Sequence, residues 1–240
     1  MPSISLPVES PYLVCEFNGY SGAQKTVYLQ QRQMYIRDMS NGLSSNRTSS
    51  TVKEKDGFVW IGTDNGLNRY DGFDFKVFNQ QNSDMSSSSI TDLLLDKKGR
   101  LWVATLNGGL NLYNSEENTF QVFKSNTEDN NSLPSNNVRT LFEDSEGKLW
   151  VGTEGGLSWY DESSQGFITY KLDKNNSESL SNTIVTSIFE DSKGNLWVGT
   201  FGGGLNKFSR TSQDFISIQS TSGIQTDFIH TLNELYETTL

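Results

Sequence analysis

A ten-residue segment that recurs four times constrains the fold of this chain more than any other feature. Its copies span residues 54–63, 96–105, 144–153 and 191–200, so they begin 42, 48 and 47 residues apart. The last two copies, DSEGKLWVGT and DSKGNLWVGT, differ at only two positions. Self-similarity at such a spacing is the signature of a repeat architecture, in which each copy forms one structural unit.

The spacing within each copy is stricter than the spacing between copies. An apolar residue opens each copy 17 positions before the tryptophan, as Leu133 precedes Trp150. The interval from a tryptophan to the next apolar opener varies from 25 to 31 residues. This contrast predicts a packed inner part joined by variable loops. The four openers are Leu43, Met85, Leu133 and Leu180, with Ile224 as the opener of an incomplete fifth copy.

Each copy predicts four short strands separated by turns. The runs are short and apolar, and Asp-x-x-Gly or Gly-rich turns bound them. Four antiparallel strands per copy form the blade of a β-propeller, whose sheets bury their faces against neighbouring blades. We therefore predict an all-β chain in which an N-terminal segment, residues 1–33, is partly disordered. Residues 34–240 are expected to form propeller blades at 43–78, 85–123, 133–170 and 180–218, with a partial fifth at 224–240.

The residues that repeat are predicted to be scaffold. The tryptophan suits a wedge between blades, the acid can cap the turn, and the glycine supplies a left-handed backbone conformation. Two alternatives are that the tryptophans stack against sugars and that the acids pair as in a glycosidase. One acid per blade would keep the acids apart around a ring, which favours the scaffold interpretation. The residues concerned are Trp60, Trp102, Trp150, Trp197, Asp96, Asp144, Asp191, Gly57, Gly99, Gly147 and Gly194.

Composition argues against several classes of function. The net charge of −10 would repel a phosphate backbone, so nucleic acid is not an expected partner. The single cysteine, Cys15, excludes an intrachain disulfide, and the single histidine, His230, leaves little for a zinc site or a nucleophile–histidine pair. No cofactor or metal is predicted. The sequence as given contains neither an 18-residue apolar run nor the pattern of a secretory signal.

Three motifs together resemble a known family. They are the ten-residue segment, the Gly-Gly-Leu-Asn-x-Tyr run after it, and the spacer at residues 131–136. Residues 65–75, NGLNRYDGFDF, also look like the first full blade of such proteins. The resemblance is to the two-component regulator propeller repeat and covers about residues 34–232. It implies a seven-bladed propeller, often two in tandem, in the periplasmic sensor region of bacterial inner-membrane receptors. Their output is a histidine kinase, often hybrid, or a diguanylate cyclase.

The resemblance shapes the expected function. With about four and a half blades and no output domain, the chain is expected to be a fragment of a sensor and not itself a kinase. It would be a non-catalytic ligand-sensing or interaction module for an oligosaccharide or other small molecule. The remaining blades and the output domain of the parent receptor would be its partners. The alternatives are a propeller enzyme, such as a polysaccharide lyase or hydrolase, and a scaffold that recognises proteins. Exposed end blades would favour self-association, and residues 34–39 could instead close a small ring.

Candidate ligand-binding residues lie in the loops. In propellers, the turns between second and third strands and the segments leading into the first strands usually line one mouth of the channel. Amides, arginines and acids there would suit polyhydroxylated ligands. His230 shares its first-strand position with Arg139, so it either contacts the ligand or fills the channel, and Trp159 is considered as an exposed aromatic. The candidates are Asn46, Arg47, Asp64, Asn65, Asn107, Asn136, Asn137, Arg139, Glu154, Phe201 and His230.

Overall fold

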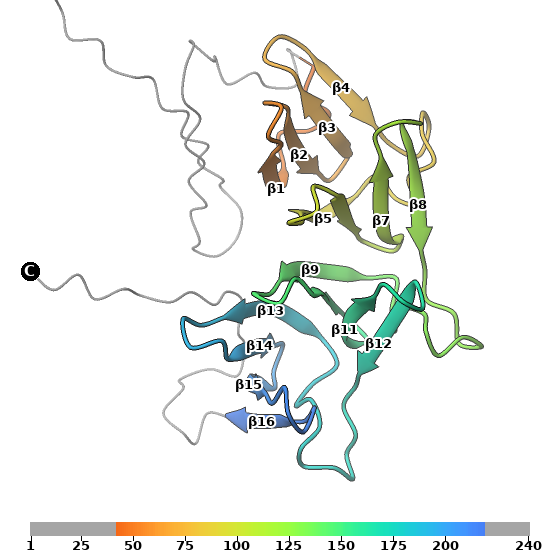
Figure 1. The fold of residues 1–240 in the computed structure, drawn as a ribbon. Helices are drawn as coiled ribbons and strands as arrows, with labels where there is room; N and C mark the ends of the chain where they lie inside the picture. Colours follow the sequence, from red (N-terminus) through yellow and green to blue (C-terminus); the bar gives the residue numbers. More distant parts are fainter. Residues whose placement is uncertain (1–41, 219–240) are drawn as a thin grey trace, which may run out of the picture.

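The computed structural model describes residues 42–218, which form four antiparallel sheets of four strands each (Figure 1). Blade 1 contains β1 (Thr48–Lys53), β2 (Val59–Thr63), β3 (Gly66–Tyr70) and β4 (Phe75–Phe78). Blade 2 contains β5 (Ile90–Leu95), β6 (Leu101–Thr105), β7 (Gly109–Asn114) and β8 (Thr119–Phe123). Blade 3 contains β9 (Val138–Glu143), β10 (Leu149–Thr153), β11 (Gly156–Asp161) and β12 (Gly166–Tyr170). Blade 4 contains β13 (Val185–Glu190), β14 (Leu196–Thr200), β15 (Gly204–Phe208) and β16 (Phe215–Ile218).

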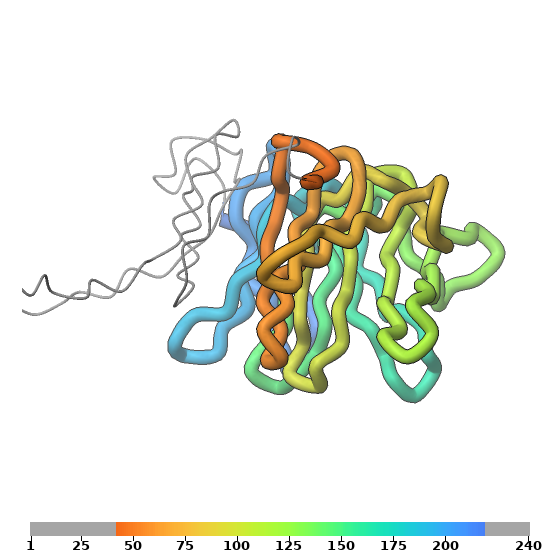
Figure 2. The backbone as a smooth tube through the Cα atoms, turned by 90° about the horizontal axis from the view of Figure 1, so that it is seen from above, coloured from red at the N-terminus to blue at the C-terminus, as the bar shows by residue number. Residues whose placement is uncertain are grey.

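The four predicted blades are confirmed, and they form an open arc (Figure 1). In each blade the strands follow one another in sequence order across the sheet. The first strands of successive blades, β1, β5, β9 and β13, contact one another, which places them on the inner side of the arc. The strands run between two ends of the molecule, where the turns and loops gather (Figure 2). The N-terminal segment, the strand expected at 34–39 and the partial fifth blade lie outside the described residues.

Three of the four repeated tryptophans form the core of the interfaces between the described blades, whereas Trp197 of blade 4 is half-buried. Trp60, Trp102 and Trp150 are at most 1% exposed. Each packs among the buried side chains of the following blade, and the Trp150 ring meets the Phe208 ring edge-on at 5.2 Å. Burying an aromatic side chain of this size contributes strongly to stability because it removes a large apolar area from water. The tryptophan therefore joins one blade to the next.

The small residue two positions after each tryptophan lets the next blade approach. A Cβ added to Gly152 would lie 2.7 Å from Val185 of blade 4, closer than side chains tolerate. The same addition to Gly62 would lie 2.6 Å from Ile90 of blade 2. Blade 2 carries Ala104 at this position, and it is fully buried. The sequence pattern Trp-Val-Gly thus combines a wedge with the space that the neighbouring blade needs.

In blades 1, 2 and 4 a buried asparagine on the third strand holds the segment that leads into the blade. In blade 4 the side-chain oxygen of Asn206 accepts hydrogen bonds from the backbone N–H of Ser181 (3.1 Å) and from the Ser217 hydroxyl (3.0 Å). Its amide donates to the carbonyl of Val198 (3.2 Å). Asn68 and Asn111 accept the equivalent backbone bonds in blades 1 and 2.

Blade 3 changes both partners of this bond. Pro134 takes the place of the serine whose N–H would donate, and a proline has no such group. The third strand accordingly carries Ser158 in place of asparagine, and its hydroxyl bonds to Thr169 (2.8 Å). The exchange avoids leaving a buried amide oxygen without a donor.

Replacing Trp150 tests the contribution of the wedge. We expect Trp150→Ala to lower the free energy of unfolding by about 3–5 kcal/mol, because it opens a cavity between blades 3 and 4. Ile168→Ala is the control in the same sheet, since Ile168 is 40% exposed on β12, and it should cost less than about 1 kcal/mol. Urea unfolding would measure both variants. Equal losses would contradict the assignment.

Replacing the buried asparagine tests the lead-in bond. Asn206→Ala removes the acceptor of the Ser181 N–H and should cost about 1–3 kcal/mol. Ser158→Ala at the equivalent position of blade 3 should cost less than about 1 kcal/mol, because Pro134 has no N–H to satisfy. The comparison is again made by urea unfolding, and a greater loss for Ser158→Ala would refute the pairing.

Candidate functional site

Each innermost strand carries a β-bulge at the same position. In blade 3, Val138 pairs with Thr153 and Thr140 pairs with Gly152, so Arg139 has no partner on β10. The same shift occurs in β1, β5 and β13, where the extra residue is Ser49, Thr91 and Thr186, respectively. A bulge re-aims its extra side chain, and bulges are frequent beside functional sites. These are the first-strand positions that the sequence predicts to face the channel.

The turn after each second strand lies against the residue that precedes the bulge by two positions. The backbone N–H of Glu154 donates to the carbonyl of Asn137 (3.0 Å), and that of Asp64 donates to Arg47 (3.2 Å). Leu106 and Phe201 make the same bond to Ser89 and Ile184. Each blade thus contributes three equivalent positions: the bulge residue, the residue two positions before it, and the first residue of the turn after the second strand. We call these positions in the four blades the rim. Its members are Arg47, Ser49, Asp64, Ser89, Thr91, Leu106, Asn137, Arg139, Glu154, Ile184, Thr186 and Phe201.

The rim of blade 3 is a hydrogen-bonded polar cluster. Arg139 donates to Oε1 of Glu154 through Nε (3.1 Å) and Nη2 (2.5 Å). The side-chain amide of Asn137 donates to Oε2 of the same carboxylate (2.7 Å). The Asn137 amide and the Arg139 guanidinium hold the pKa of Glu154 below its usual range. Asn137 also accepts the backbone N–H of Asn107 from blade 2 (2.8 Å), so the cluster spans two blades.

The structure thus brings four predicted site residues together and separates others. Arg47 and Asp64 form an exposed ion pair of 3.5 Å in blade 1. Asn65 and Asn136 instead bond to backbone, since Asn65 donates to the Ser44 carbonyl and Asn136 accepts the Ser125 N–H. Asn46 is an exposed residue of the lead-in segment of blade 1. His230 lies outside the described residues.

Leu106 is a rim residue that the candidate set omits. It is 39% exposed, and Phe201 at the same position of blade 4 is 43% exposed. The sequence carried a signal for it, because Leu106 follows Thr105 as Glu154 follows Thr153. The rim therefore alternates between acids in blades 1 and 3 and apolar side chains in blades 2 and 4.

The repeated acids are held at the opposite end of the strands, in the first turn of each blade. Asp144 is 1% exposed and accepts the indole N–H of Trp150 at 2.8 Å. Glu54, Asp96 and Asp191 accept the equivalent indole bonds at 2.8–2.9 Å. Asp144 also caps its turn by accepting the Lys148 N–H (2.9 Å), and Gly147 has a positive φ of 81°. The other turn glycines, Gly57, Gly99 and Gly194, also have positive φ.

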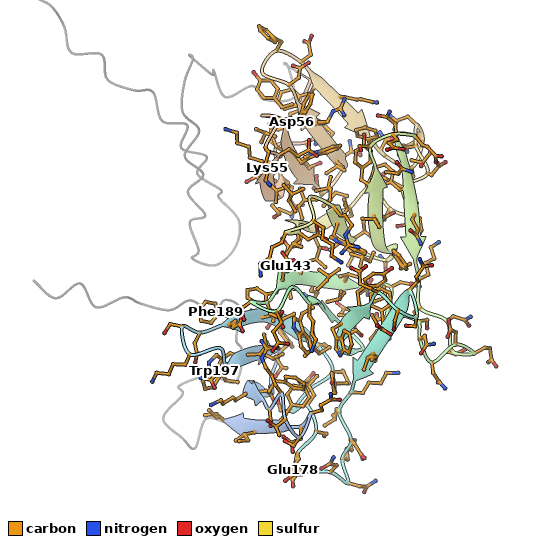
Figure 3. All side chains as sticks on the ribbon, viewed as in Figure 1. Lys55, Asp56, Glu143, Glu178, Phe189 and Trp197 are labelled. Atoms are coloured by element: carbon orange, nitrogen blue, oxygen red, sulfur yellow. The ribbon has the colours of Figure 1, made fainter. Side chains whose placement is uncertain are left out.

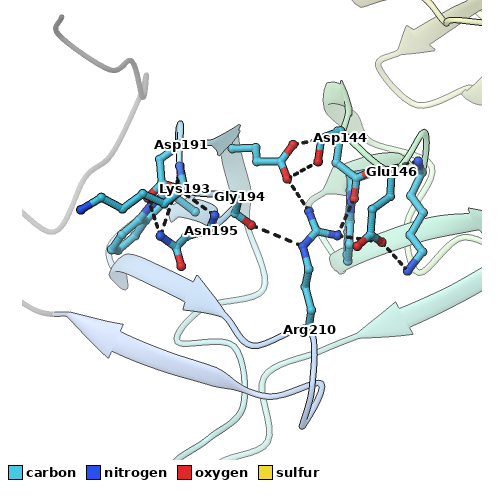
Figure 4. A network of polar contacts seen from close by, with 12 residues as sticks. Asp144, Glu146, Asp191, Lys193, Gly194, Asn195 and Arg210 are labelled. Atoms are coloured by element: carbon cyan, nitrogen blue, oxygen red, sulfur yellow. Dashed lines mark hydrogen bonds and ion pairs between the residues drawn. The ribbon is translucent and has the colours of Figure 1, made fainter.

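An ion network joins the acids of blades 3 and 4 (Figure 4). Arg210, from the β15–β16 turn, contacts Asp144 of blade 3 at 2.8 Å and Glu190 of blade 4 at 2.7 Å. Burial would raise the pKa of Asp144, but Trp150, the Lys148 N–H and Arg210 together hold it below its usual range. A carboxylate with a lowered pKa and with its oxygens engaged in hydrogen bonds and an ion pair suits a structural role better than acid catalysis.

At the junction of blades 2 and 3 the ion pairs have the opposite arrangement, with an acid in the later blade and cations in the earlier one. Glu162, in the turn equivalent to that of Arg210, accepts from Lys98 and Arg100 of blade 2 at 2.7 Å each. These residues line a cavity of about 160 Å³ that also contacts Trp159. Trp159 is half-buried, and the Lys148 ammonium lies 5.1 Å from its ring centre. The residues around this cavity therefore pair with one another.

Comparison with known families identifies the repeat. Residues 84–107, 132–155 and 179–202 match the family described as Two component regulator propeller. Parts of blades 2, 3 and 4 are thus similar to the two-component regulator propeller repeat. Each match runs from just before the opener to the turn after the second strand, which is the part with fixed spacing. The resemblance seen in the sequence is confirmed, although no curated protein matches the chain.

Solved structures share this propeller architecture. The extracellular domain of BT3049 from B. thetaiotaomicron, described as a hybrid two component system, is 29% identical with a TM-score of 0.68 over 79% of this chain. The extracellular domain of BT4673, described likewise, is 22% identical over 85% of the chain with a TM-score of 0.63. This chain spans 26% of the length of each.

A more distant match shows the fold alone. Catalytically inactive virginiamycin B lyase from Staphylococcus aureus, solved with quinupristin, is 13% identical with a TM-score of 0.54, covering 81% of this chain and 60% of that one.

Within residues 42–218, no helix is long and apolar enough to cross a membrane. The same residues contain no group of three or more His, Cys, Asp or Glu side chains that could hold a metal ion.

The acid–tryptophan bond predicts a dependence of stability on pH. Burial opposes ionisation of Asp191, but Trp197 and Asn195 lower its pKa to about 2. Because the pKa in the folded state is below the unfolded value of about 3.9, the ionised group stabilises the fold above pH 4. That contribution is lost as the pH falls toward 2. The difference in urea midpoint between the native chain and Asp191→Asn should therefore shrink over this window.

The control for this experiment is Asp56→Asn, which changes an acid in an exposed turn of blade 1. Its difference from the native chain should stay small at every pH. A difference for Asp191→Asn that is constant from pH 4 to pH 2 would contradict the assignment.

Proposed function

We propose that the chain is a non-catalytic ligand-sensing module of a two-component-type receptor and binds its ligand at the rim. The contrast between scaffold and rim supports this proposal. Tryptophan, turn glycine and second-strand threonine recur in all four blades, whereas the rim residues differ in charge, size and polarity from blade to blade. A surface that varies on a constant framework is where binding specificity resides in repeat proteins.

The rim chemistry suits an oligosaccharide. Asn137 and Arg139 of the rim, with Asn107 next to Leu106, supply amide and guanidinium groups, and Glu154 supplies a carboxylate with its charge retained at neutral pH. Leu106 and Phe201 lie at the flanking positions, where an exposed apolar side chain can contact the less polar face of a sugar ring. Few oriented polar groups beside apolar surface are the usual composition of a small-molecule site.

The proposed location follows from the structural relatives. This chain would form part of the periplasmic or extracellular sensor of an inner-membrane receptor, since BT3049 and BT4673 are described as extracellular domains. Further blades and an output domain, either a histidine kinase or a diguanylate cyclase, would belong to the same receptor. The chain itself would carry no catalytic residues.

A signal could begin at the junction of blades 2 and 3. The Asn107–Asn137 bond and the bond from the Gly109 N–H to the Asn136 carbonyl (2.8 Å) both cross this junction at the rim. A ligand that engages Asn137 and Glu154 would compete with or tighten these bonds. It would thereby favour one packing arrangement of blades 2 and 3 over another. A ligand can transmit a conformational signal only if it binds the two arrangements with different affinity.

Glycan binding tests the proposal. The purified chain is screened on an array of neutral and acidic oligosaccharides, and hits are titrated by calorimetry. Arg139→Ala and Glu154→Gln should each weaken binding at least about tenfold, because each removes a charged partner from the cluster. Lys98→Ala, in an exposed ion pair at the other end of the strands, should bind as the native chain does.

Two results would count against oligosaccharide binding at the rim. One is the absence of any hit on the array. The other is equal loss of binding in Arg139→Ala and Lys98→Ala. Binding of a protein partner that is lost in Leu106→Ser would favour the second candidate, a propeller that recognises proteins, to which the exposed Leu106 and Phe201 point.

A further inference from the structure

Two arginines at the acid-turn end of the strands each hold at least two carboxylates. Arg100 bonds to Asp96 through Nε (2.6 Å) and to Glu162 through Nη2 (2.7 Å). Arg210 likewise joins an acid of blade 3 to an acid of blade 4, at 2.8 and 2.7 Å (Figure 4). Both side chains are largely enclosed, with 27% and 24% of their surface exposed. A guanidinium can do this because its planar fork offers N–H groups to more than one carboxylate.

Arg139 on the rim holds one carboxylate within the described chain. Both Nε and Nη2 donate to the same oxygen of Glu154, Oε1. The Nη1 of Arg139 has no hydrogen-bond partner among residues 42–218, and 43% of the side chain is exposed. The N–H groups that Arg100 and Arg210 give to a further acid are thus still available on Arg139.

The one carboxylate that Arg139 holds is itself fixed by its surroundings. Oε2 of Glu154 accepts the side-chain amide of Asn137 (2.7 Å), and the backbone N–H of Glu154 donates to the Asn137 carbonyl (3.0 Å). The bulge in β9 leaves Arg139 without a partner on β10, so its side chain is placed against this carboxylate. A guanidinium held in this way loses less conformational entropy when it binds a further group.

The acceptors of this cluster are already engaged, whereas donors remain. Oε1 of Glu154 accepts two bonds from Arg139, and Oε2 accepts one from Asn137. The side-chain oxygen of Asn137 accepts the backbone N–H of Asn107 (2.8 Å). The groups left for a ligand at this point of the rim are therefore mainly the N–H donors of Arg139. A planar group with two acceptor oxygens, such as a carboxylate, matches them.

We propose that the rim binds an acidic oligosaccharide, and that a ligand carboxylate occupies Arg139 as a second acid occupies Arg100 and Arg210. Glu154 is then a positioning residue, which orients the guanidinium and leaves its open N–H groups to the ligand. This proposal rests on the proposed function and narrows it from oligosaccharides in general to those that contain uronate units.

The arginine on the rim of blade 1 is not held in the same way. The closest approach between Arg47 and Asp64 is 3.5 Å, and 87% of the Arg47 side chain is exposed. Ion pairs with this exposure contribute little, because both side chains lose freedom and the charges are screened by water. Blade 3 therefore offers the oriented guanidinium, and blade 1 does not.

The negative net charge of the chain is compatible with such a ligand. Glu143 lies at the acid-turn end of β9 and accepts the N–H of Lys97 there (Figure 3). It stands four residues from Arg139, which is about 13 Å at the usual rise of a strand. Charges more than about 8 Å apart are largely screened at physiological ionic strength. The ligand carboxylate therefore responds mainly to the group that it contacts.

Calorimetric titration with acidic oligosaccharides and their methyl esters tests the proposal. The probes are oligomers of galacturonate, glucuronate and mannuronate, each beside its fully methyl-esterified form, which has the same chain without the charge. The native chain should bind at least one acid oligomer at least about tenfold more tightly than its ester, because the ester cannot form charge-assisted bonds to Arg139. Arg139→Ala should bind the two forms equally.

Three further variants separate the roles of the residues. Arg139→Gln can still donate to Glu154 but has no charge, so it should lose the preference for the acid form as Arg139→Ala does. Glu154→Gln should keep this preference at a lower affinity, because the guanidinium is present but less well oriented. Lys98→Ala removes a cation from an exposed ion pair at the acid-turn end and should keep both the affinity and the preference.

The outcomes distinguish this proposal from the proposed function. Neutral glycans that bind in an Arg139-dependent way, with no preference for acid over ester, would overturn the acidic ligand and leave binding at the rim intact. A preference for the acid form that persists in both Arg139 variants would overturn the role of Arg139. Binding of no acid oligomer by the native chain would also overturn the proposal.

Discussion

The packing of one tryptophan per blade against the next blade is the interaction on which the structure depends. A four-stranded sheet has two apolar faces and cannot bury them alone. The indole of Trp150 fills the space between blades 3 and 4, and its N–H is satisfied by Asp144, which also caps the turn. One acid thus fixes both the turn and the orientation of the wedge. This coupling explains why the acid, glycine and tryptophan recur together at fixed spacing.

Much of the fold could be predicted because these interactions are local and repeated. The number of strands per blade, the buried tryptophans and the turn glycines all follow from spacing within one copy. The indole–acid bond, the bulges and the network around Arg210 could not be predicted in the same way. They depend on how neighbouring strands or blades lie against each other, and Arg210 and Glu162 carry opposite charges at equivalent positions.

The sequence predicted only part of the candidate site, because its contacts also depend on how neighbouring strands and blades lie against each other. The bulge in β9 leaves Arg139 without a partner on β10, and its side chain bonds to Glu154 in the turn after β10. Asn137 joins this cluster by bonding to Glu154 and to the N–H of Asn107. Asn65 and Asn136 are equally polar and equally close in sequence, yet they satisfy backbone groups. Composition alone cannot separate an amide that holds a loop from one that is available to a ligand. Leu106 was missed although Phe201, at the same turn position of blade 4, was among the candidates, so only a comparison of all four turns would have found it.

The two ends of the strands have different roles, since the acid turns stabilise the blades and the rim is proposed to bind the ligand. Backbone amide NMR during titration with an oligosaccharide identified on the array tests this division most directly. The account predicts that the largest shifts fall on Asn107, Asn137, Arg139 and Glu154, with little change around Asp96, Lys98 and Glu162. Shifts concentrated at the acid turns, with an unchanged rim, would contradict it.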